Sequence, residues 1–313
     1  MNSFKYGCVV NGKWYCGRPF LERELSKFVA SGQNVVLQGE RRMGKTSLLH
    51  ETLRGMSGWR LIYIDLLHIH SVEDFCKRVL SAVREFHGKT TFFEKALRLL
   101  PRLRPVVNYD PVGGSFGYTF DVKASQTPEA VEEVIGMLAA QARKKKVAIA
   151  FDEFQSILDL PDCQQVLALL RGKIQFQPEI PYVFTGSVRH QMTDLFDNPD
   201  SAFYKSAITL CVGPIDRTDF VRFLKGRFSA AKRRLEPGII AEALSEVDDI
   251  PGDAQELCEA LCDVTEENSA IRSADIARAL EVVFAREGDK FEGYCSQLSP
   301  IQFKLIVAMA VYG

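Results

Sequence analysis

The sequence predicts an α/β domain built on a parallel sheet, followed by a domain made of helices alone. Up to about residue 212, segments with helical spacing alternate with short apolar runs, as in a sheet that is covered by helices. After Gly213-Pro214 the apolar runs stop and only helical spacing continues. We therefore expect a first domain at 1–213, a helical domain at 214–290, and a linker with one further helix at 291–313.

The charge balance and the apolar runs exclude several classes of protein. The 39 basic and 40 acidic side chains leave a net charge of −1, so a nucleic-acid partner would have to meet a local basic patch. No run approaches the roughly 18 apolar residues of a membrane helix. The N-terminus also lacks the pattern of a signal peptide. We expect a cytoplasmic protein with no membrane contact.

The elements of the first domain follow from the alternation. Helices are expected at 21–29, 46–54, 72–86 and 128–143, and buried strands at 35–37, 61–64, 147–151 and 182–184. The pair Asn11-Gly12 predicts a hairpin at the N-terminus, with Val10 opposite Lys13. Prolines and glycines break the rhythm at 88–125, which we interpret as an inserted hairpin with strands at 106–109 and 116–122 after a basic helix.

The second domain is predicted to contain four helices, at 217–228, 237–247, 251–263 and 273–286. A last helix would begin with Ser299 as N-cap and Pro300 at its first position. We expect it to be amphipathic, with an apolar face of Ile301, Leu305, Ile306 and Met309. Six basic residues form either a phosphate-contacting patch or, more simply, a solvated face: Arg222, Lys225, Arg227, Lys232, Arg233 and Arg234.

A glycine-rich motif lies between the strand at 35–37 and the helix at 46–54. It fits G-x-x-x-x-G-K-[ST], the phosphate-binding loop of nucleotide hydrolases. Its backbone N–H groups would face phosphates at a helix N-terminus. Lys45 would neutralise the β and γ phosphates, and the Thr46 hydroxyl would bind Mg²⁺. The simpler alternative is a glycine-rich turn that caps a helix. The expected nucleotide-binding residues here are Gly39, Glu40, Arg41, Arg42, Met43, Gly44, Lys45, Thr46 and Ser47.

Two carboxylates follow the apolar strand at 147–151. Neighbouring residues of a strand point in different directions, so Asp152 can hold the metal while Glu153 polarises a water. A solvated turn is the alternative. However, so complete an apolar run predicts a buried strand, and buried acids need a partner. A metal and a water would supply one.

Small polar residues follow the strand at 182–184, which we expect between the phosphate-loop strand and the Asp152 strand. Thr185 or Ser187 could hydrogen-bond the γ-phosphate or the attacking water. Alternatively, Ser187 caps the next helix. No N-K-x-D or T-K-x-D motif for reading guanine occurs in the sequence, which favours adenine.

The sequence resembles the archaeal-type ATPases of the STAND class, within the wider AAA+ group. The resemblance covers nearly the whole chain. It rests on Phe4-Lys-Tyr-Gly7, Cys16-Gly17-Arg18, Glu22-Arg-Glu-Leu25, the stretch from Gly39 to Leu49 with its double arginine, Phe151-Asp-Glu-Phe-Gln155, Thr185-Gly-Ser187, Met192 and Leu195-Phe196. It implies a five-stranded core in the order 5-1-4-3-2, a helical lid, and a nucleotide held between them.

The resemblance also implies roles for single residues. Gly17 and Arg18 would lie near the adenine or the junction of core and lid. Lys205 follows Tyr204 where the family has Tyr-Gly-Arg, so either Lys205 or Arg189 would serve as cationic sensor or trans-acting finger. Gln255 stands where related initiator ATPases carry a second-sensor arginine, and a neutral amide cannot follow phosphate charge as a guanidinium does. This departure favours the STAND branch.

The helix at 299–313 resembles the first helix of the winged-helix domain that follows the lid in this family. A winged helix needs about sixty residues, so we expect the sequence to be part of a longer protein. The missing part of that domain would be the place of contact with DNA.

Three functional hypotheses follow. The first is an ATP-binding and slowly hydrolysing switch that couples nucleotide state to a C-terminal recognition domain. The second is a DNA-binding initiator or loader, and the third is a scaffold that holds ADP and scarcely turns over. ATP or ADP with Mg²⁺ is the expected cofactor in all three. A protein partner or a homo-oligomer is compatible with each of them.

Overall fold

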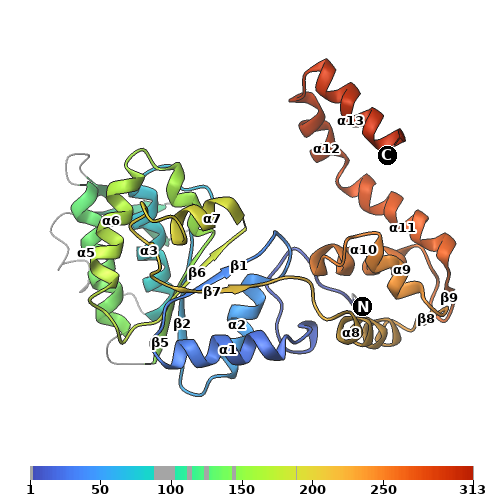
Figure 1. Ribbon diagram of the computed structural model, residues 1–313, viewed down its shortest axis with the longest axis horizontal. Helices are drawn as coiled ribbons and strands as arrows, with labels where there is room; N and C mark the ends of the chain where they lie inside the picture. The colour runs from blue at the N-terminus through green and yellow to red at the C-terminus, as the bar shows by residue number, and fades with distance from the viewer. Residues whose placement is uncertain are drawn as a thin grey trace. The chain divides into compact units, whose positions relative to one another are not determined.

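The chain divides into two compact units (Figure 1). The computed structural model describes residues 3–87, 103–110, 115–122, 127–142, 146–187 and 189–312. One unit, here called the sheet unit, is Asn11–Gly213, and the other, the helical unit, combines Met1–Val10 with Pro214–Gly313. The two units divide after Gly213. The first ten residues, expected in the first domain, cluster with the helical unit instead.

The sheet unit is built on five parallel strands. They are β1 (Val35–Gln38), β2 (Arg60–Asp65), β5 (Val147–Asp152), β6 (Tyr182–Gly186) and β7 (Ile208–Cys211). Their order across the sheet is β2-β5-β6-β1-β7, and each adjacent pair runs parallel. Counted along the chain as first to fifth strand, this order is 5-1-4-3-2. The predicted α/β fold and its strand order are therefore confirmed, with β6 between β1 and β5.

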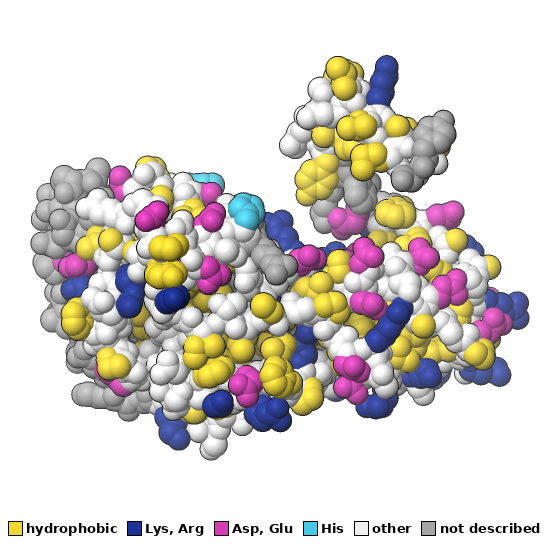
Figure 2. All heavy atoms as spheres, in the orientation of Figure 1, with side chains coloured by type: hydrophobic (Ala, Val, Ile, Leu, Met, Phe, Trp, Pro, Cys, Tyr) yellow, Lys and Arg dark blue, Asp and Glu magenta, His cyan; other side chains and the backbone are white. Residues whose placement is uncertain are grey.

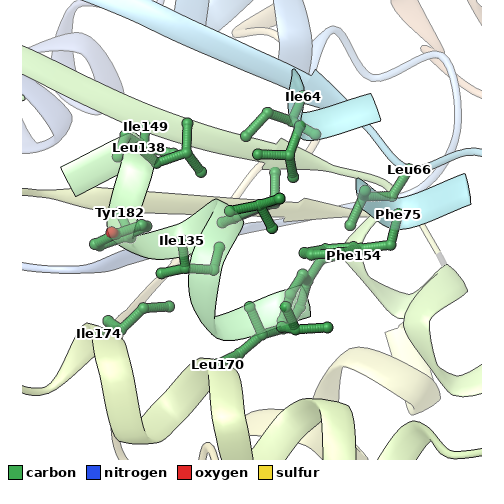
Figure 3. Packing of buried hydrophobic residues seen from close by; sticks show 14 of the residues in the cluster. Ile64, Leu66, Phe75, Ile135, Leu138, Ile149, Phe154, Leu170, Ile174 and Tyr182 are labelled. Atoms are coloured by element: carbon green, nitrogen blue, oxygen red, sulfur yellow. The ribbon is translucent and has the colours of Figure 1, made fainter. Parts of the chain in front are cut away.

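Helices cover both faces of this sheet (Figure 1). Those on one side are α1 (Pro19–Ala30) and α2 (Lys45–Gly55), and those on the other are α3 (Val72–His87), α5 (Thr127–Ala142) and α6 (Cys163–Ile174). Figure 3 shows apolar side chains of β2, β5, β6, α3, α5 and α6 meeting in one layer. The helix α6 was not predicted.

Aromatic packing fixes the strand ends that carry the polar residues of interest. Phe154 opens the short 3-10 helix η3 (Phe154–Asp159), and its ring centroid lies 4.6 Å from that of Phe184 in β6. Phe196, the last residue of α7 (Arg189–Phe196), lies 5.2 Å from Phe184. Phe203 packs on the same ring at 5.5 Å. Phe151 of β5 stacks on Phe184 as well, at 6.0 Å, so the cluster holds the ends of β5 and β6 together. These two phenylalanines directly precede Asp152 and Thr185.

The inserted hairpin is present as an antiparallel pair, β3 (Leu103–Asp110) with β4 (Ser115–Val122). The strand β3 extends beyond the predicted strand at both ends, and β4 begins one residue earlier than predicted. The basic helix expected before the hairpin falls on residues 88–102, which lie outside the described residues.

The predicted N-terminal hairpin is wrong. Gly12–Trp14 forms a single turn of 3-10 helix, η1, in which the Trp14 amide donates to the Asn11 carbonyl at 3.1 Å. The Asn-Gly pair does make a turn, since Gly12 has φ +52°. The Gly12 amide, however, donates to Glu51 Oε2 of α2 at 3.1 Å. This stretch therefore closes a turn against α2, and no strand is found on either side of it in the described residues.

The helical unit contains α8 (Arg217–Ala230), α9 (Ile239–Ser245), α10 (Pro251–Asp263), α11 (Ser273–Arg286), α12 (Gly288–Ser296) and α13 (Pro300–Tyr312). The four predicted helices correspond to α8 to α11. Two strands of two residues each, β8 (Arg234–Leu235) and β9 (Ala270–Ile271), form an unpredicted parallel pair. The N-terminal segment joins this core through Phe4, whose ring centroid lies 4.9 Å from that of Phe228.

The last helix begins as predicted. The Gln302 amide donates to Ser299 Oγ at 3.3 Å, and the Ser299 amide donates to Gln302 Oε1 at 2.9 Å. The expectation that α13 is amphipathic is wrong, because apolar residues also occupy the other side of the helix. Its large apolar side chains are between 44% and 80% exposed: Ile301, Phe303, Leu305, Ile306, Val307, Met309 and Val311. Figure 2 shows hydrophobic side chains over the region of α13.

Nothing in the part of the chain that the structure describes resembles a membrane span, since every helix there is too short or too polar to cross a bilayer.

Candidate functional site

The glycine-rich loop connects β1 to α2, which begins at Lys45. Gly44 has φ +84°, a left-handed conformation that favours glycine, and it leaves the first turn of α2 without a side-chain cap. Gly39 is required for a different reason. A Cβ at this position would lie 2.2 Å from the carbonyl oxygen of Val212, the residue after β7. The first glycine of the motif therefore lets the loop pass the edge of the sheet.

Lys45 lies inside this loop. Its side chain is only 6% exposed, and its Nζ donates to the carbonyls of Gly39 and Glu40, each at 2.8 Å. Burial lowers the pKa of Lys45, while the nearby charges of Glu153 and Asp152 act in the opposite direction. The loop carbonyls thus surround the Lys45 ammonium group, and the charges of Glu153 and Asp152 favour its protonated form.

The remaining loop side chains differ in exposure. Arg41 and Arg42 are exposed, and Arg42 has φ +63°. Met43 is buried, and its place in the nucleotide site remains a proposal. Two guanidinium groups are therefore accessible from solvent beside a buried ammonium group.

Asp152, at the end of β5, collects donors from several elements. Its Oδ2 accepts from the Thr46 hydroxyl at 2.7 Å and from the Tyr63 hydroxyl at 2.5 Å. Its Oδ1 accepts from the Thr185 hydroxyl and from the Glu153 amide, the latter at 3.0 Å. The structure thus brings together three of the candidate residues, Thr46, Asp152 and Thr185. Tyr63 was not predicted.

Glu153 faces a different set of groups. It has φ +49°, which turns the chain away from the strand direction directly after Asp152. Its Oε2 accepts from the Ser187 hydroxyl at 2.7 Å and from the amide nitrogen of Gln155. Ser187 is therefore beside Glu153, as expected of a residue that follows the neighbouring strand. Gln155 was missed, although it is part of the stretch that carries the family resemblance.

Arg18 contacts the phosphate loop directly. Its guanidinium, 8% exposed, donates through Nη2 to the Met43 carbonyl at 2.8 Å and through Nη1 to the Gly213 carbonyl at 2.6 Å. Burial lowers the pKa of Arg18. Gly17, which precedes it, is exposed. The guanidinium thus joins the loop backbone to the last residue of the sheet unit.

Three other predicted residues lie elsewhere. Gln255 is a buried residue of α10 in the helical unit. Lys205 is exposed, with φ +50° and its ammonium 5.1 Å from the centre of the Tyr204 ring. Arg189 opens α7, and its side chain lies outside the described residues.

The donor set fits a nucleotide triphosphate with Mg²⁺. The start of α2 has the geometry that favours an anion, and Lys45 places a cation against it. The Thr46 hydroxyl and the Asp152 carboxylate, in direct contact, are oxygen ligands of the kind that Mg²⁺ prefers. Glu153 directly follows Asp152 and is partly exposed.

No protein-family model matches the chain, and no curated protein sequence matches it. Several solved structures are similar to this chain. The Walker-type ATPase of Pyrococcus abyssi superposes on 94% of this chain and 79% of its own, with a TM-score of 0.64 and 20% identity. The ORC1 protein of Aeropyrum pernix in complex with DNA matches 92% of this chain and 70% of its own, with a TM-score of 0.60 and 16% identity.

A third solved structure, the ADP form of the ORC2 protein of Aeropyrum pernix, matches 89% of this chain and 71% of its own, with a TM-score of 0.56 and 14% identity. At these identities the likeness concerns the fold. The chain has the fold of the AAA+ P-loop NTPases, a parallel five-stranded sheet followed by a helical region.

Proposed function

We propose that this chain binds ATP with Mg²⁺ and hydrolyses it slowly, as a switch of the STAND kind within the AAA+ group. The observation that carries the proposal is the pair formed by Thr46 and Asp152, 2.7 Å apart, beside a lysine enclosed by its own phosphate loop. A helix-capping turn does not require a buried lysine. A solvated strand end does not require a buried aspartate with four donors.

The chain's own residues suggest how nucleotide is held. Lys45 would exchange the carbonyls of Gly39 and Glu40 for the β and γ phosphates, which are stronger acceptors because they are charged. Thr46 and Asp152 would hold the Mg²⁺, which neutralises phosphate charge when bound. Gly17, Arg18, Arg41, Arg42 and Ser47 remain proposed contacts of the nucleotide, as does Gln255.

Glu153 is the proposed general base. It would take a proton from a water whose oxygen attacks the γ phosphorus, while the bond from that phosphorus to the bridging oxygen breaks to give ADP and phosphate. In the structure its carboxylate is engaged by Ser187 and Gln155. A base that must first leave two donors supports slow turnover. Thr185, Ser187 and Arg189 are the proposed partners of the γ-phosphate or water.

A DNA-dependent initiator or loader is the second candidate, favoured by the likeness to an ORC1 protein that binds DNA. The basic residues of the helical unit support it less. Arg222 pairs with Asp219 at 2.8 Å, and Arg233 donates to the Cys262 and Thr265 carbonyls. Much of this cationic surface is thus used within the unit. We also propose that α13 is the first helix of a winged-helix domain, and that this is the recognition domain to which the switch couples its nucleotide state.

Steady-state ATP turnover, measured with and without duplex DNA, separates the candidates. We expect slow turnover that DNA leaves unchanged and that Glu153→Gln abolishes, because the amide keeps the shape of the base but cannot accept the proton. Stimulation by DNA would favour the loader. Bound ADP without turnover would favour the scaffold. Equal single-turnover rates for the native protein and Glu153→Gln would remove Glu153 from the catalytic role.

A further inference from the structure

The carboxylate of Asp152 has one hydrogen-bond donor that the phosphate-loop motifs do not account for. Tyr63 of β2 donates its hydroxyl proton to Oδ2 at 2.5 Å, the same oxygen that accepts from Thr46. Asp152 is only 6% exposed. Its carboxylate is therefore oriented by the groups around it rather than by water.

The register of the sheet places Tyr63 for this contact. In the parallel pair of β2 with β5, Tyr63 lies opposite Ala150 and Asp65 lies opposite Asp152. Side chains alternate along a strand, so Tyr63 and Asp152 share one face of the sheet. The small Ala150 leaves room for the ring between them. The buried Ile62 and Ile64 belong to the other face.

A second residue supports the tyrosine ring. His50 of α2 lies with its ring centroid 5.1 Å from that of Tyr63. Burial lowers the pKa of His50, so the imidazole is neutral at pH 7. The side chain of Tyr63 thus contacts β5 through Asp152 and α2 through His50. The helix α2 also carries Thr46, the other hydroxyl donor to Oδ2.

The Asp152 carboxylate is surrounded by donors from several elements. An ionised carboxylate offers about four acceptor positions. Those of Asp152 meet three hydroxyls and one backbone amide. Removing the Tyr63 hydroxyl would free the carboxylate to rotate away from Thr46.

We propose that Tyr63 is a positioning residue that orients the Asp152 carboxylate toward Thr46 for binding of the nucleotide-associated Mg²⁺. The proposal rests on the proposed function of this site. The expected effect is specific to the metal, because Tyr63 bonds the proposed metal ligand Asp152, whereas the loop carbonyls are bonded by Lys45. Loss of its hydroxyl should therefore weaken the binding of Mg²⁺ and leave the metal-free affinity for ATP intact.

The test is calorimetric titration of ATP into the protein over a series of Mg²⁺ concentrations and again in EDTA. Outer partners of metal ligands contribute about 10- to 100-fold to metal affinity. For Tyr63→Phe we expect the half-saturating Mg²⁺ concentration to rise about tenfold, with the affinity for ATP in EDTA unchanged. Tyr182→Phe is the matched control, because Tyr182 is a buried strand tyrosine whose hydroxyl bonds Gln177 Oε1 at 2.5 Å. It should change neither value.

Two results would overturn the proposal. One is a Tyr63→Phe protein with the Mg²⁺ dependence of the native protein. The other is an equal loss of ATP affinity with Mg²⁺ and in EDTA, which would make Tyr63 a structural residue of the sheet. A failure of the native protein to bind ATP at all would overturn the proposed function itself, and it is visible before any variant is made.

Discussion

Asp152 and Glu153 follow one another at the end of β5 but meet different groups. Hydroxyls from β2, α2 and β6 meet Asp152, whereas Glu153, at φ +49°, meets Ser187 and Gln155. The left-handed conformation at Glu153 points the two carboxylates into different surroundings. At the scale of single residues, this separation would allow one acid to hold the proposed metal and the other to take a proton.

Gln155 is the residue that should limit turnover. Its nitrogen donates to Glu153, while its Oε1 is buried without a hydrogen-bond partner among the described residues. Gln155→Leu should therefore fold well, since it removes a half-satisfied buried amide. We expect the single-turnover rate to rise about fivefold, the value of one hydrogen bond of about 1 kcal/mol. Rapid-quench measurement of ADP formation checks this, with ATP affinity as the control. A rate at or below that of the native protein would contradict the restraint on Glu153.

The sequence identifies residues whose roles come from local motifs and misses those whose roles come from contacts across the fold. Lys45, Thr46 and Asp152 stand in recognisable order beside a strand or a helix. Tyr63 is one aromatic residue within an apolar strand, and only the register with β5 brings its hydroxyl to Asp152. Gln155 depends on the turn that Glu153 makes.

At the scale of elements, the buried strands are predictable because each is an uninterrupted apolar run. The strand β7 lies at the edge of the sheet and is four residues long. Its residues alternate between partly exposed and exposed, so no buried apolar run marks it. The N-terminal hairpin shows the opposite error. Asn11-Gly12 is a strong local turn signal, but the turn closes a short 3-10 helix and the Gly12 amide bonds Glu51 of α2. Tertiary context decides what a turn connects.

A substitution at Gly39 tests whether the phosphate loop packs closely against the residue after β7. Gly39→Ala would place a Cβ 2.2 Å from a backbone oxygen, and overpacking of this kind costs about 1–3 kcal/mol in the free energy of unfolding. Gly172→Ala in α6 is the control, because nothing lies within 4 Å of its added Cβ. It should stabilise the protein by about 0.5–1 kcal/mol. Urea denaturation without nucleotide measures both, and equal effects would contradict the close passage.

At the scale of the whole molecule, the net charge of −1 and the internally paired arginines argue against strong DNA binding by these residues. We expect weak binding that falls steeply with salt, because it would come from phosphate contacts alone. Fluorescence anisotropy with duplexes of different sequence at two salt concentrations measures this. Tight binding that distinguishes the sequences at physiological salt would show that the sheet unit or the helical unit reads bases.

The central claim is that the loop around Lys45 is a site for the phosphates of ATP. Calorimetric titration of ATP·Mg²⁺ into the native protein and Lys45→Ala tests it most directly. We predict a loss of affinity of about 100-fold, since charge-assisted hydrogen bonds contribute about 1.5–3 kcal/mol each. Lys27→Ala is the control, because Lys27 is an exposed lysine of α1 that pairs with Glu24 at 3.7 Å, and it should bind ATP as the native protein does. Equal affinities for the native protein and a folded Lys45→Ala protein would contradict the account.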